Sequence, residues 1–218
     1  MAVTDTQRAY ELLQEKIVTT EMLPGSVIHE ASLMAEIGLG RTPIREALKM
    51  LEAERLVTVS PRRGMFVTNI NISDLAEIEE VRSALDPLSV RLAAQRITAS
   101  EIAEMRALVA EVDTCLARRT GNGHHAADMR ELMSLDRRFH HLLAQSTRNT
   151  ILISEIEMLY NLSRRIWYFY LERLTPADLA FDAITDVIDA LEERDVEKAV
   201  KALTAHIADF GASIRKWL

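Results

Sequence analysis

The chain has 218 residues, of which 48% are hydrophobic and 27% charged, the usual mixture of a soluble globular protein. Glycine and proline are few, which favours helices, and the single cysteine, Cys115, excludes an internal disulfide and a cysteine-ligated zinc cluster. No apolar run reaches the roughly 18 residues that a membrane span needs, and the N-terminus is charged rather than signal-like, so we expect a cytoplasmic protein.

Basic residues are concentrated in one short stretch, although the net charge of the whole chain is −7. Residues 41–63 carry six Lys or Arg residues against three Glu residues. A local basic surface on an otherwise acidic protein favours contact with a polyanion at that surface alone.

The first part of the chain predicts three helices. Apolar side chains recur at helical spacing over residues 5–20, which predicts an amphipathic helix. Residues 30–37 predict a short helix and residues 42–53 a second one, with Thr42 as its N-cap. A turn with two glycines, residues 38–40, joins these two short helices. Two short helices around such a turn are typical of a helix-turn-helix unit.

A β-hairpin is predicted directly after the helix-turn-helix. Two runs rich in β-branched residues, 56–60 and 65–68, flank the turn Pro61-Arg62-Arg63-Gly64. A hairpin in this place is a wing, and its tip carries Arg62 and Arg63. These two side chains are suited to contact with a phosphate backbone or with a minor groove.

The helix predicted over residues 42–53 has the composition of a recognition helix. Such a helix enters the major groove with its N-terminal residues near the base edges, which is where Arg41, Thr42 and Arg45 lie. Arginine pairs bidentately with guanine, and a threonine hydroxyl suits a phosphate. Helix-turn-helix units also serve as protein-contact modules, so an interaction module that binds no DNA stays open on these grounds.

Residues 40–48 (GRTPIREAL), 51–57 (LEAERLV) and 61–67 (PRRGMFV) closely resemble the GntR family of bacterial regulators. The resemblance covers about residues 8–68 and implies a winged helix-turn-helix that binds operator DNA. The positions that it implies as DNA contacts are Arg41, Thr42, Arg45, Arg63 and Gly64. Two positions depart from the family pattern: Gly40 stands where a serine is usual, and Ala31 stands where an arginine is usual. The second departure removes one expected DNA contact.

The rest of the chain predicts helices and no strand. We expect residues 1–70 to form the winged helix-turn-helix domain and residues 71–218 to form an all-helical effector-binding and dimerisation domain. The helices are predicted at residues 73–96, 98–118, 126–146, 149–173, 176–193 and 196–217, with a loose loop at 119–125. The expected fold class is therefore mainly α, with an antiparallel helical bundle as the second domain.

Three polar residues interrupt the apolar pattern of this predicted bundle. Asp136 and His140 are four residues apart and share one helix face, and His206 lies in an apolar stripe of the last helix. A carboxylate with imidazoles suits zinc, nickel or a similar ion. An Asp–His hydrogen bond with a separately satisfied His206 explains the same pattern without a metal. A metal-dependent enzyme built on these residues is the alternative function, but no further acid–base motif is visible, so we expect no enzyme.

Arg82 with Asp86, residues 136–142 and the stretch from Asp195 to His206 resemble the helical effector domain, of FCD type, in the FadR-type branch of the same family. This resemblance covers about residues 74–217. It implies a divalent metal such as zinc, nickel or manganese held by one Asp and three His residues, beside a carboxylate effector that an arginine binds. The matching positions here are Arg82 for the effector and Asp136, His140 and His206 for both metal and effector. Ile184 stands where a histidine ligand is usual, which leaves open whether a metal binds.

The two resemblances together imply a ligand-responsive transcriptional regulator, more often a repressor in this family. It is expected to act as a homodimer on a palindromic operator, because two-fold protein symmetry matches two-fold DNA symmetry. A small organic acid is the expected effector. A cluster of arginine and aromatic residues at 164–170 is interpreted as core or surface packing, with a pocket wall or a dimer face as the alternatives.

Overall fold

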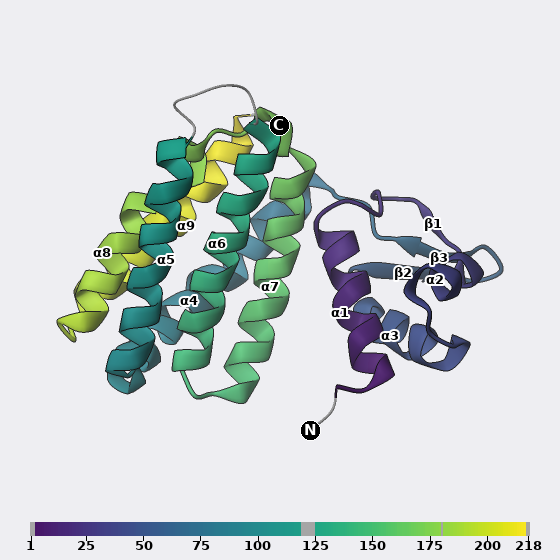
Figure 1. Ribbon diagram of the computed structural model, residues 1–218, viewed down its shortest axis with the longest axis horizontal. Helices are drawn as coiled ribbons and strands as arrows, with labels where there is room; N and C mark the ends of the chain where they lie inside the picture. The colour runs from purple at the N-terminus through teal and green to yellow at the C-terminus, as the bar shows by residue number, and fades with distance from the viewer. Residues whose placement is uncertain (1–2, 119–124, 180, 217–218) are drawn as a thin grey trace. The chain divides into compact units, whose positions relative to one another are not determined.

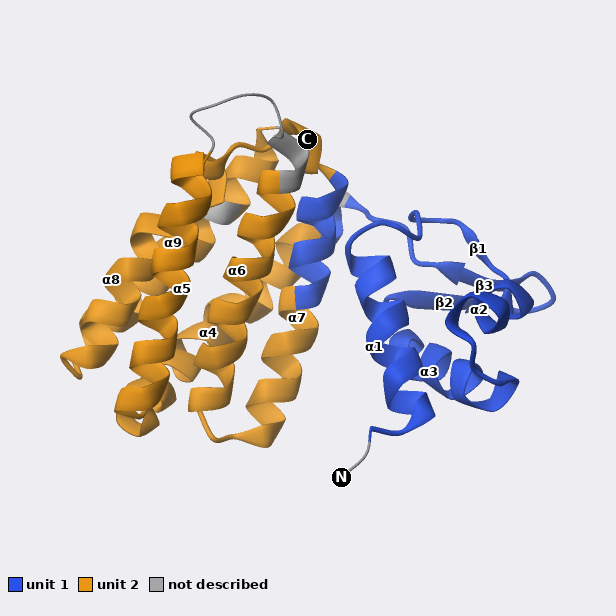
Figure 2. Cartoon of the chain, viewed as in Figure 1, with its two compact units in different colours: residues 1–74, 161–169 blue, residues 75–160, 170–218 orange. Residues whose placement is uncertain are grey.

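The computed structural model describes residues 3–118, 125–179 and 181–216. The chain divides into two compact units, which Figure 2 shows in blue and orange. The first unit comprises residues 1–74 and 161–169, and the second comprises residues 75–160 and 170–218. The prediction of a mainly α fold is confirmed (Figure 1). In the part of the chain that the structure describes, none of the helices has the length and apolar character that crossing a membrane requires.

The N-terminal part of the first unit has the element order of a winged helix-turn-helix. Its elements are α1 (Asp5–Val18), β1 (Val27–Ile28), α2 (Glu30–Ile37), α3 (Arg41–Ala53), β2 (Val57–Ser60) and β3 (Gly64–Val67). The three strands form an antiparallel sheet in the order β1-β3-β2, with Ser60 paired with Gly64 at the tip of the wing. The predicted hairpin is therefore confirmed. The strand β1 was not predicted, because two residues are too short to show an alternating pattern.

The apolar faces of α1 and α3 form the core of this unit. Their fully buried members are Ala9, Leu13, Ile17, Ile44, Ala47, Leu48 and Leu51. At the end of α3, the Glu54 carboxylate accepts a hydrogen bond from the Tyr10 hydroxyl at 2.5 Å and from Gln14 Nε2 at 2.8 Å. Apolar packing and this polar contact together fix α3 on α1 and leave the other face of α3 exposed.

The prediction of Thr42 as an N-cap is wrong, because α3 begins at Arg41 and its N-cap is Gly40. The preceding helix ends at Gly38, whose φ of 73° is the left-handed conformation that glycine adopts without strain. Gly40 is already extended, so the helix starts one residue later and Thr42 lies inside its first turn. Glycine is an acceptable N-cap residue, although its lack of a side chain leaves the helical N–H groups uncapped.

Helices make up the rest of the described chain. They are α4 (Ile72–Arg96), α5 (Ala99–Arg118), α6 (His125–Ser146), α7 (Thr150–Phe169), α8 (Phe181–Glu192) and α9 (Val196–Arg215). Two short 3₁₀ helices, η1 (Leu171–Arg173) and η2 (Pro176–Leu179), connect α7 to α8. Within the second unit, α5 packs against α6 and α8, and α8 packs against α9. The predicted loop at 119–125 falls almost entirely outside the described residues.

Two predicted helix boundaries are wrong between α7 and α8. The helix predicted over 149–173 ends at Phe169, and the helix predicted over 176–193 begins only at Phe181. The Thr175 backbone N–H and hydroxyl both donate to Asp178 Oδ2, at 2.8 and 2.7 Å. This local cap closes a separate 3₁₀ turn that starts at Pro176, so the chain changes direction before α8.

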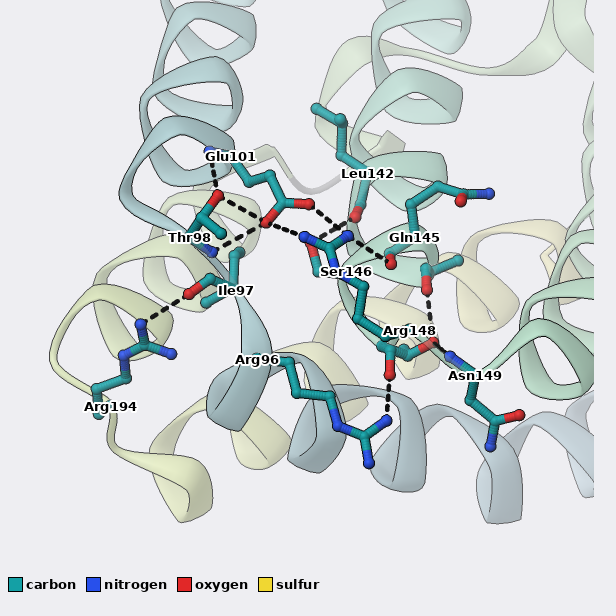
Figure 3. Close-up of polar contacts among 12 residues, drawn as sticks. Arg96, Ile97, Thr98, Glu101, Leu142, Gln145, Ser146, Arg148, Asn149 and Arg194 are labelled. Atoms are coloured by element: carbon teal, nitrogen blue, oxygen red, sulfur yellow. Dashed lines mark hydrogen bonds and ion pairs between the residues drawn. The ribbon is translucent and has the colours of Figure 1, made fainter.

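Polar contacts link two helix corners of the second unit (Figure 3). A capping box starts α5, since the Thr98 N–H donates to Glu101 Oε2 at 2.9 Å and the Glu101 N–H donates to Thr98 Oγ1 at 3.3 Å. Arg148, in the α6–α7 turn, pairs with the same Glu101 carboxylate at 2.8 Å. The α4–α5 corner is thereby tied to the α6–α7 corner, which fixes the ends of the helices that carry the polar cluster described below.

Candidate functional site

The N-terminal end of α3 presents the predicted DNA-contact residues to solvent. Arg41, Thr42 and Arg45 are all exposed, because the buried stripe of α3 occupies the opposite face. The Arg45 side chain is 57% exposed, and its Nε donates to Glu30 Oε1 of α2 at 2.8 Å. An exposed ion pair of this kind contributes little to stability, so a phosphate or a base edge can replace Glu30 at small cost.

The wing places its basic residues at an exposed turn. Arg62 and Arg63 lie between the paired ends of β2 and β3, and the Arg63 guanidinium lies 5.9 Å from the centre of the Phe66 ring. Arg62 has φ of 64° and Gly64 has φ of 105°. The second angle favours glycine, which gives Gly64 a conformational reason to be in the wing independent of any DNA contact.

Sequence reasoning did not single out Lys49 as a site residue. It lies one helical turn beyond Arg45, is exposed, and pairs with Glu46 at 2.9 Å. Residues four apart share a helix face, so this spacing was the available signal. Arg45 and Lys49 together extend the basic face along α3.

The structure brings Asp136, His140 and His206 together inside the second unit. Asp136 and His140 come from α6 and His206 from α9, and all three are buried. The Nε2 atoms of the two histidines are 3.3 Å apart, and each lies 3.7 Å from Asp136 Oδ1. A distance of 3.7 Å is too long for a hydrogen bond, so the simple Asp–His hydrogen bond considered from the sequence does not account for this arrangement.

The two oxygens of Asp136 have different surroundings. The Tyr160 hydroxyl, from α7, donates to Oδ2 at 2.7 Å. Among the described residues, Oδ1 is buried without a hydrogen-bond partner. A buried carboxylate oxygen without a partner is costly, so its position beside two imidazole nitrogens calls for a ligand or ion that would satisfy it. Tyr160 was not identified from the sequence, since it lies 24 residues away in an apolar stretch.

Burial and charge set the protonation of this cluster. Burial, reinforced by His206 and Arg82 and opposed by Asp136, lowers the pKa of His140 to about 3, so its imidazole is neutral at pH 7. Burial alone would raise the pKa of Asp136, but His140, His206 and the Tyr160 hydroxyl outweigh it and lower that pKa to about 2. A neutral imidazole and an ionised carboxylate are the forms that bind a metal.

The spacing of the three ligand atoms fits a tetrahedral metal. Zinc–nitrogen and zinc–oxygen bonds of about 2.0–2.2 Å at tetrahedral angles separate neighbouring ligand atoms by about 3.3–3.6 Å. The observed separations of 3.3, 3.7 and 3.7 Å are close to these values. Three protein ligands leave the fourth tetrahedral position for water or another ligand, which is the pattern of an open zinc site.

Ile184 lies in α8 and is buried. It lines a cavity of about 40 Å³ together with Leu135 and Phe139, the residues that precede Asp136 and His140 on α6. The cluster that the described residues form therefore has three candidate ligands, with an apolar side chain at the position where the resemblance implies a fourth.

A buried ion pair adjoins the cluster. Arg82 Nε donates to Asp86 Oδ2 at 2.9 Å, one turn along α4, and both side chains are almost fully buried. Arg82 acts electrostatically on His140, and His206 acts on Asp86, so this pair and the Asp136–His140–His206 cluster are neighbours. The structure thus gathers all four residues that the sequence predicted for effector binding into one region of the second unit.

The arginine and aromatic cluster in α7 is buried. Arg164, Arg165, Trp167 and Tyr168 are each less than 10% exposed. Arg164 belongs to the first unit, where its guanidinium pairs with Glu15 of α1 at 2.6 Å. These residues are therefore packed in the interior, which is the interpretation favoured from the sequence.

Both parts of the chain match known protein families. Residues 5–67 match the family described as "Bacterial regulatory proteins, gntR family", and residues 77–209 match the FCD domain. A solved structure of E. coli McbR/YncC is similar over 99% of both chains, with a TM-score of 0.85 at 23% identity, and this likeness concerns the fold.

Relatives of known sequence agree with these matches. The Nta operon transcriptional regulator of Aminobacter aminovorans is 37% identical over 81 residues, which are 37% of this chain and 39% of the relative. The gluconate operon transcriptional repressor of Bacillus subtilis (strain 168) is 35% identical over 85 residues, which are 39% of this chain and 34% of the relative. The matched stretches thus span well under two thirds of these relatives. These relatives are regulators rather than enzymes, as expected from the sequence. The chain belongs to the GntR family of bacterial regulatory proteins and carries an FCD domain after its GntR-type N-terminal region.

Proposed function

We propose that this chain is a cytoplasmic DNA-binding transcriptional regulator whose operator affinity a small organic acid controls. Residues 1–70 would bind DNA, and residues 71–218 would bind the effector and form a homodimer. The observation that carries the proposal is the exposed basic start of α3, with Arg41, Thr42 and Arg45, in a region that matches the GntR family. Arg62, Arg63 and Gly64 of the wing add backbone contacts.

Exchanging charge at Arg45 tests this proposal. Double-stranded DNA selected from a random library by the wild-type chain serves as the probe, and fluorescence anisotropy gives its affinity. Arg45→Glu should weaken binding by about 100-fold or more, since it removes a base contact and adds a charge that phosphates repel. Arg55→Glu makes the same charge change beyond the opposite end of α3 and should weaken binding by only a few-fold. Equal losses in the two variants, or no selected DNA at all, would contradict the proposal.

For the second unit, we propose a divalent metal bound by Asp136, His140 and His206. The orphaned Asp136 Oδ1 and the tetrahedral spacing of the three ligand atoms support it. The bound metal would supply a Lewis-acidic position for an effector carboxylate, and Arg82 would bind the same effector through its guanidinium. Zinc, nickel and manganese are the candidates, and the nitrogen-rich ligand set favours zinc or nickel over manganese.

A stripe of apolar residues on α4 supports the proposed homodimer. Val81 and Leu88 are seven residues apart on one helix face and are 48% and 41% exposed, with the half-buried Leu85 between them. A second copy of the chain would cover this stripe, and two-fold symmetry would present two α3 helices to two half-sites of an operator.

Control of DNA binding would follow from a shift between dimer geometries. An effector can shift such an equilibrium only by its difference in affinity for the two geometries. We propose that the effector favours the geometry in which the two α3 helices are wrongly spaced for the operator, which is the behaviour of a repressor. One relative reported above is named a repressor.

A further inference from the structure

A second cavity lies between α4 and α9, directly outside the Arg82–Asp86 ion pair. Its volume is about 200 Å³, and its walls include Arg82, Asp86, Pro87, Thr204 and Ile207. A cavity of about 150 Å³ holds benzene in another protein, so this one has room for an acid of about six to eight heavy atoms. Both charged groups of the pair therefore border a space large enough for a small ligand.

A second ion pair also lines this cavity. Glu79 of α4 and Arg215 of α9 are 2.6 Å apart. The Glu79 side chain lies over Gly211, where any Cβ would collide with it. The two helices are thus held close together beside the cavity, and Pro87 and Ile207 give its interior an apolar wall.

The buried pair restricts which acids can enter. Arg82 and Asp86 are each 5% exposed, so little of either group is open to bulk water. An acid that takes the Arg82 guanidinium draws it away from Asp86. Separating a buried ion pair without replacing the lost partner is strongly unfavourable, because it leaves an uncompensated buried charge. A plain carboxylate offers Arg82 a partner but offers Asp86 nothing.

A proline on the same wall interrupts the backbone hydrogen bonding of α4. Pro87 has no N–H, so it cannot donate the helical hydrogen bond that the Ser83 carbonyl would normally receive from position 87. Ser83 and Pro87 both border the cavity. The charged groups that border the cavity are thus two ion pairs, the exposed Glu79–Arg215 pair and the buried Arg82–Asp86 pair.

We propose that Asp86 is a specificity-determining residue, and that the effector is an acid with a hydrogen-bond donor next to its carboxylate, a 2-hydroxy or a 2-amino acid. The carboxylate binds Arg82 while the hydroxyl or ammonium group replaces Arg82 as the partner of Asp86. Arg82 Nε and Asp86 Oδ2 are only 2.9 Å apart, so the two ligand groups must sit on the same or neighbouring carbons. The inference rests on the proposed effector-binding function of the second unit.

Three matched acids test this proposal on the full-length chain: butanoate, 2-hydroxybutanoate and 2-aminobutanoate, measured by isothermal titration calorimetry. The hydroxy or the amino acid should bind at least about tenfold more tightly than butanoate, because a site built for a donor rejects the analogue that lacks it. Which of the two binds better tells whether Asp86 prefers a neutral or a cationic partner. Asp86→Asn should reduce the discrimination to about threefold or less. Glu111→Gln, a change of the same kind in an exposed ion pair whose residues do not line this cavity, should preserve it.

Three results would overturn the proposal: butanoate binding as tightly as both analogues, unchanged discrimination in Asp86→Asn, or no binding of any of the three acids up to about 10 mM. If Asp86→Asn does not fold, as judged by circular dichroism, the wild-type ranking alone decides. Failure here is separable from failure of the proposed function. If the wild-type chain binds selected DNA and the Arg45→Glu variant does not, the protein remains a DNA-binding regulator, whichever acids it binds.

Discussion

His140 and His206 are 66 residues apart in the chain, yet their Nε2 atoms lie 3.3 Å from one another inside the second unit. Helices α6 and α9 bring them together, and both nitrogens face the same oxygen of Asp136. One imidazole could donate an N–H···N hydrogen bond to the other, but that bond would leave Asp136 Oδ1 without a partner. A metal would satisfy all three atoms at once.

Tyr160→Phe should weaken metal binding by about tenfold or more. The hydroxyl that it removes donates to Asp136 Oδ2 and so directs Oδ1 toward the histidines. Loss of such a supporting hydrogen bond commonly costs about 10–100-fold in metal affinity. Zinc competition with a fluorescent chelator measures the effect. Tyr168→Phe changes another buried tyrosine in α7 and should leave zinc affinity unchanged. Equal affinities of wild type and Tyr160→Phe would remove the positioning role of the hydroxyl.

The metal-free protein should lose stability in acid partly through His140. Its pKa is lowered by burial from 6.5 to about 3, so between these values the unfolded chain binds a proton that the folded chain does not. The contribution of His140 to the free energy of unfolding should therefore fall as pH falls through this window, and stay constant below it. His140 accounts for about 1.4 kcal/mol per pH unit of that slope near pH 5.

Urea unfolding after treatment with a chelator, at several pH values between 7 and 4.5, measures this slope. His140→Gln should have a shallower slope than wild type, because its side chain binds no proton in this range. His141→Gln removes an exposed neighbour that pairs with Glu157, and it should retain most of the wild-type slope. A wild-type slope in His140→Gln would show that His140 is not the titrating group.

The apolar stripe on α4 predicts a dimer that should dissociate when glutamates replace residues of the stripe. The double variant Val81→Glu, Leu88→Glu should convert the protein from a dimer to a monomer of about 24.6 kDa, as measured by size-exclusion chromatography with light scattering. Burying these charges in an interface is strongly unfavourable. Leu12→Glu, on an exposed position of α1, should leave the dimer intact. A monomeric wild-type chain, or a dimeric double variant, would contradict the proposed interface.

The pattern of the sequence predicted most of the first unit because its signals are local. The glycines of residues 38–40 separate two short apolar stripes, and the Pro61–Gly64 turn separates two β-branched runs. Glycine also caused the one error in this region, since Gly40 started α3 earlier than the side-chain capping signal of Thr42 suggested. The strand β1 is defined by its pairing with β3, and no two-residue sequence signal encodes that pairing.

Features of the second unit were predictable wherever helical spacing alone determines which residues share a face. The spacing of Asp136 and His140 placed both on one helix face. The last helix starts at a residue type that commonly caps helices, since Asp195 accepts a hydrogen bond from the Lys198 N–H at 3.0 Å. Tyr160 and the 3₁₀ turn at Pro176 were missed. The contact of Tyr160 depends on tertiary packing, and the 3₁₀ turn depends on a local cap that competes with helix propensity. Neither leaves a periodic signal in the sequence.

Metal content of the purified protein tests the central claim about the second unit most directly. The measurement is elemental mass spectrometry on untagged wild-type chain prepared without a chelating resin, beside His140→Ala and the matched neighbour His141→Ala. Three ligand atoms at tetrahedral spacing predict close to one zinc or nickel ion per chain in the wild type and in His141→Ala, and its loss in His140→Ala. A folded wild-type protein with no bound metal, or a His140→Ala variant with wild-type metal content, would contradict the assignment of Asp136, His140 and His206 as a metal site.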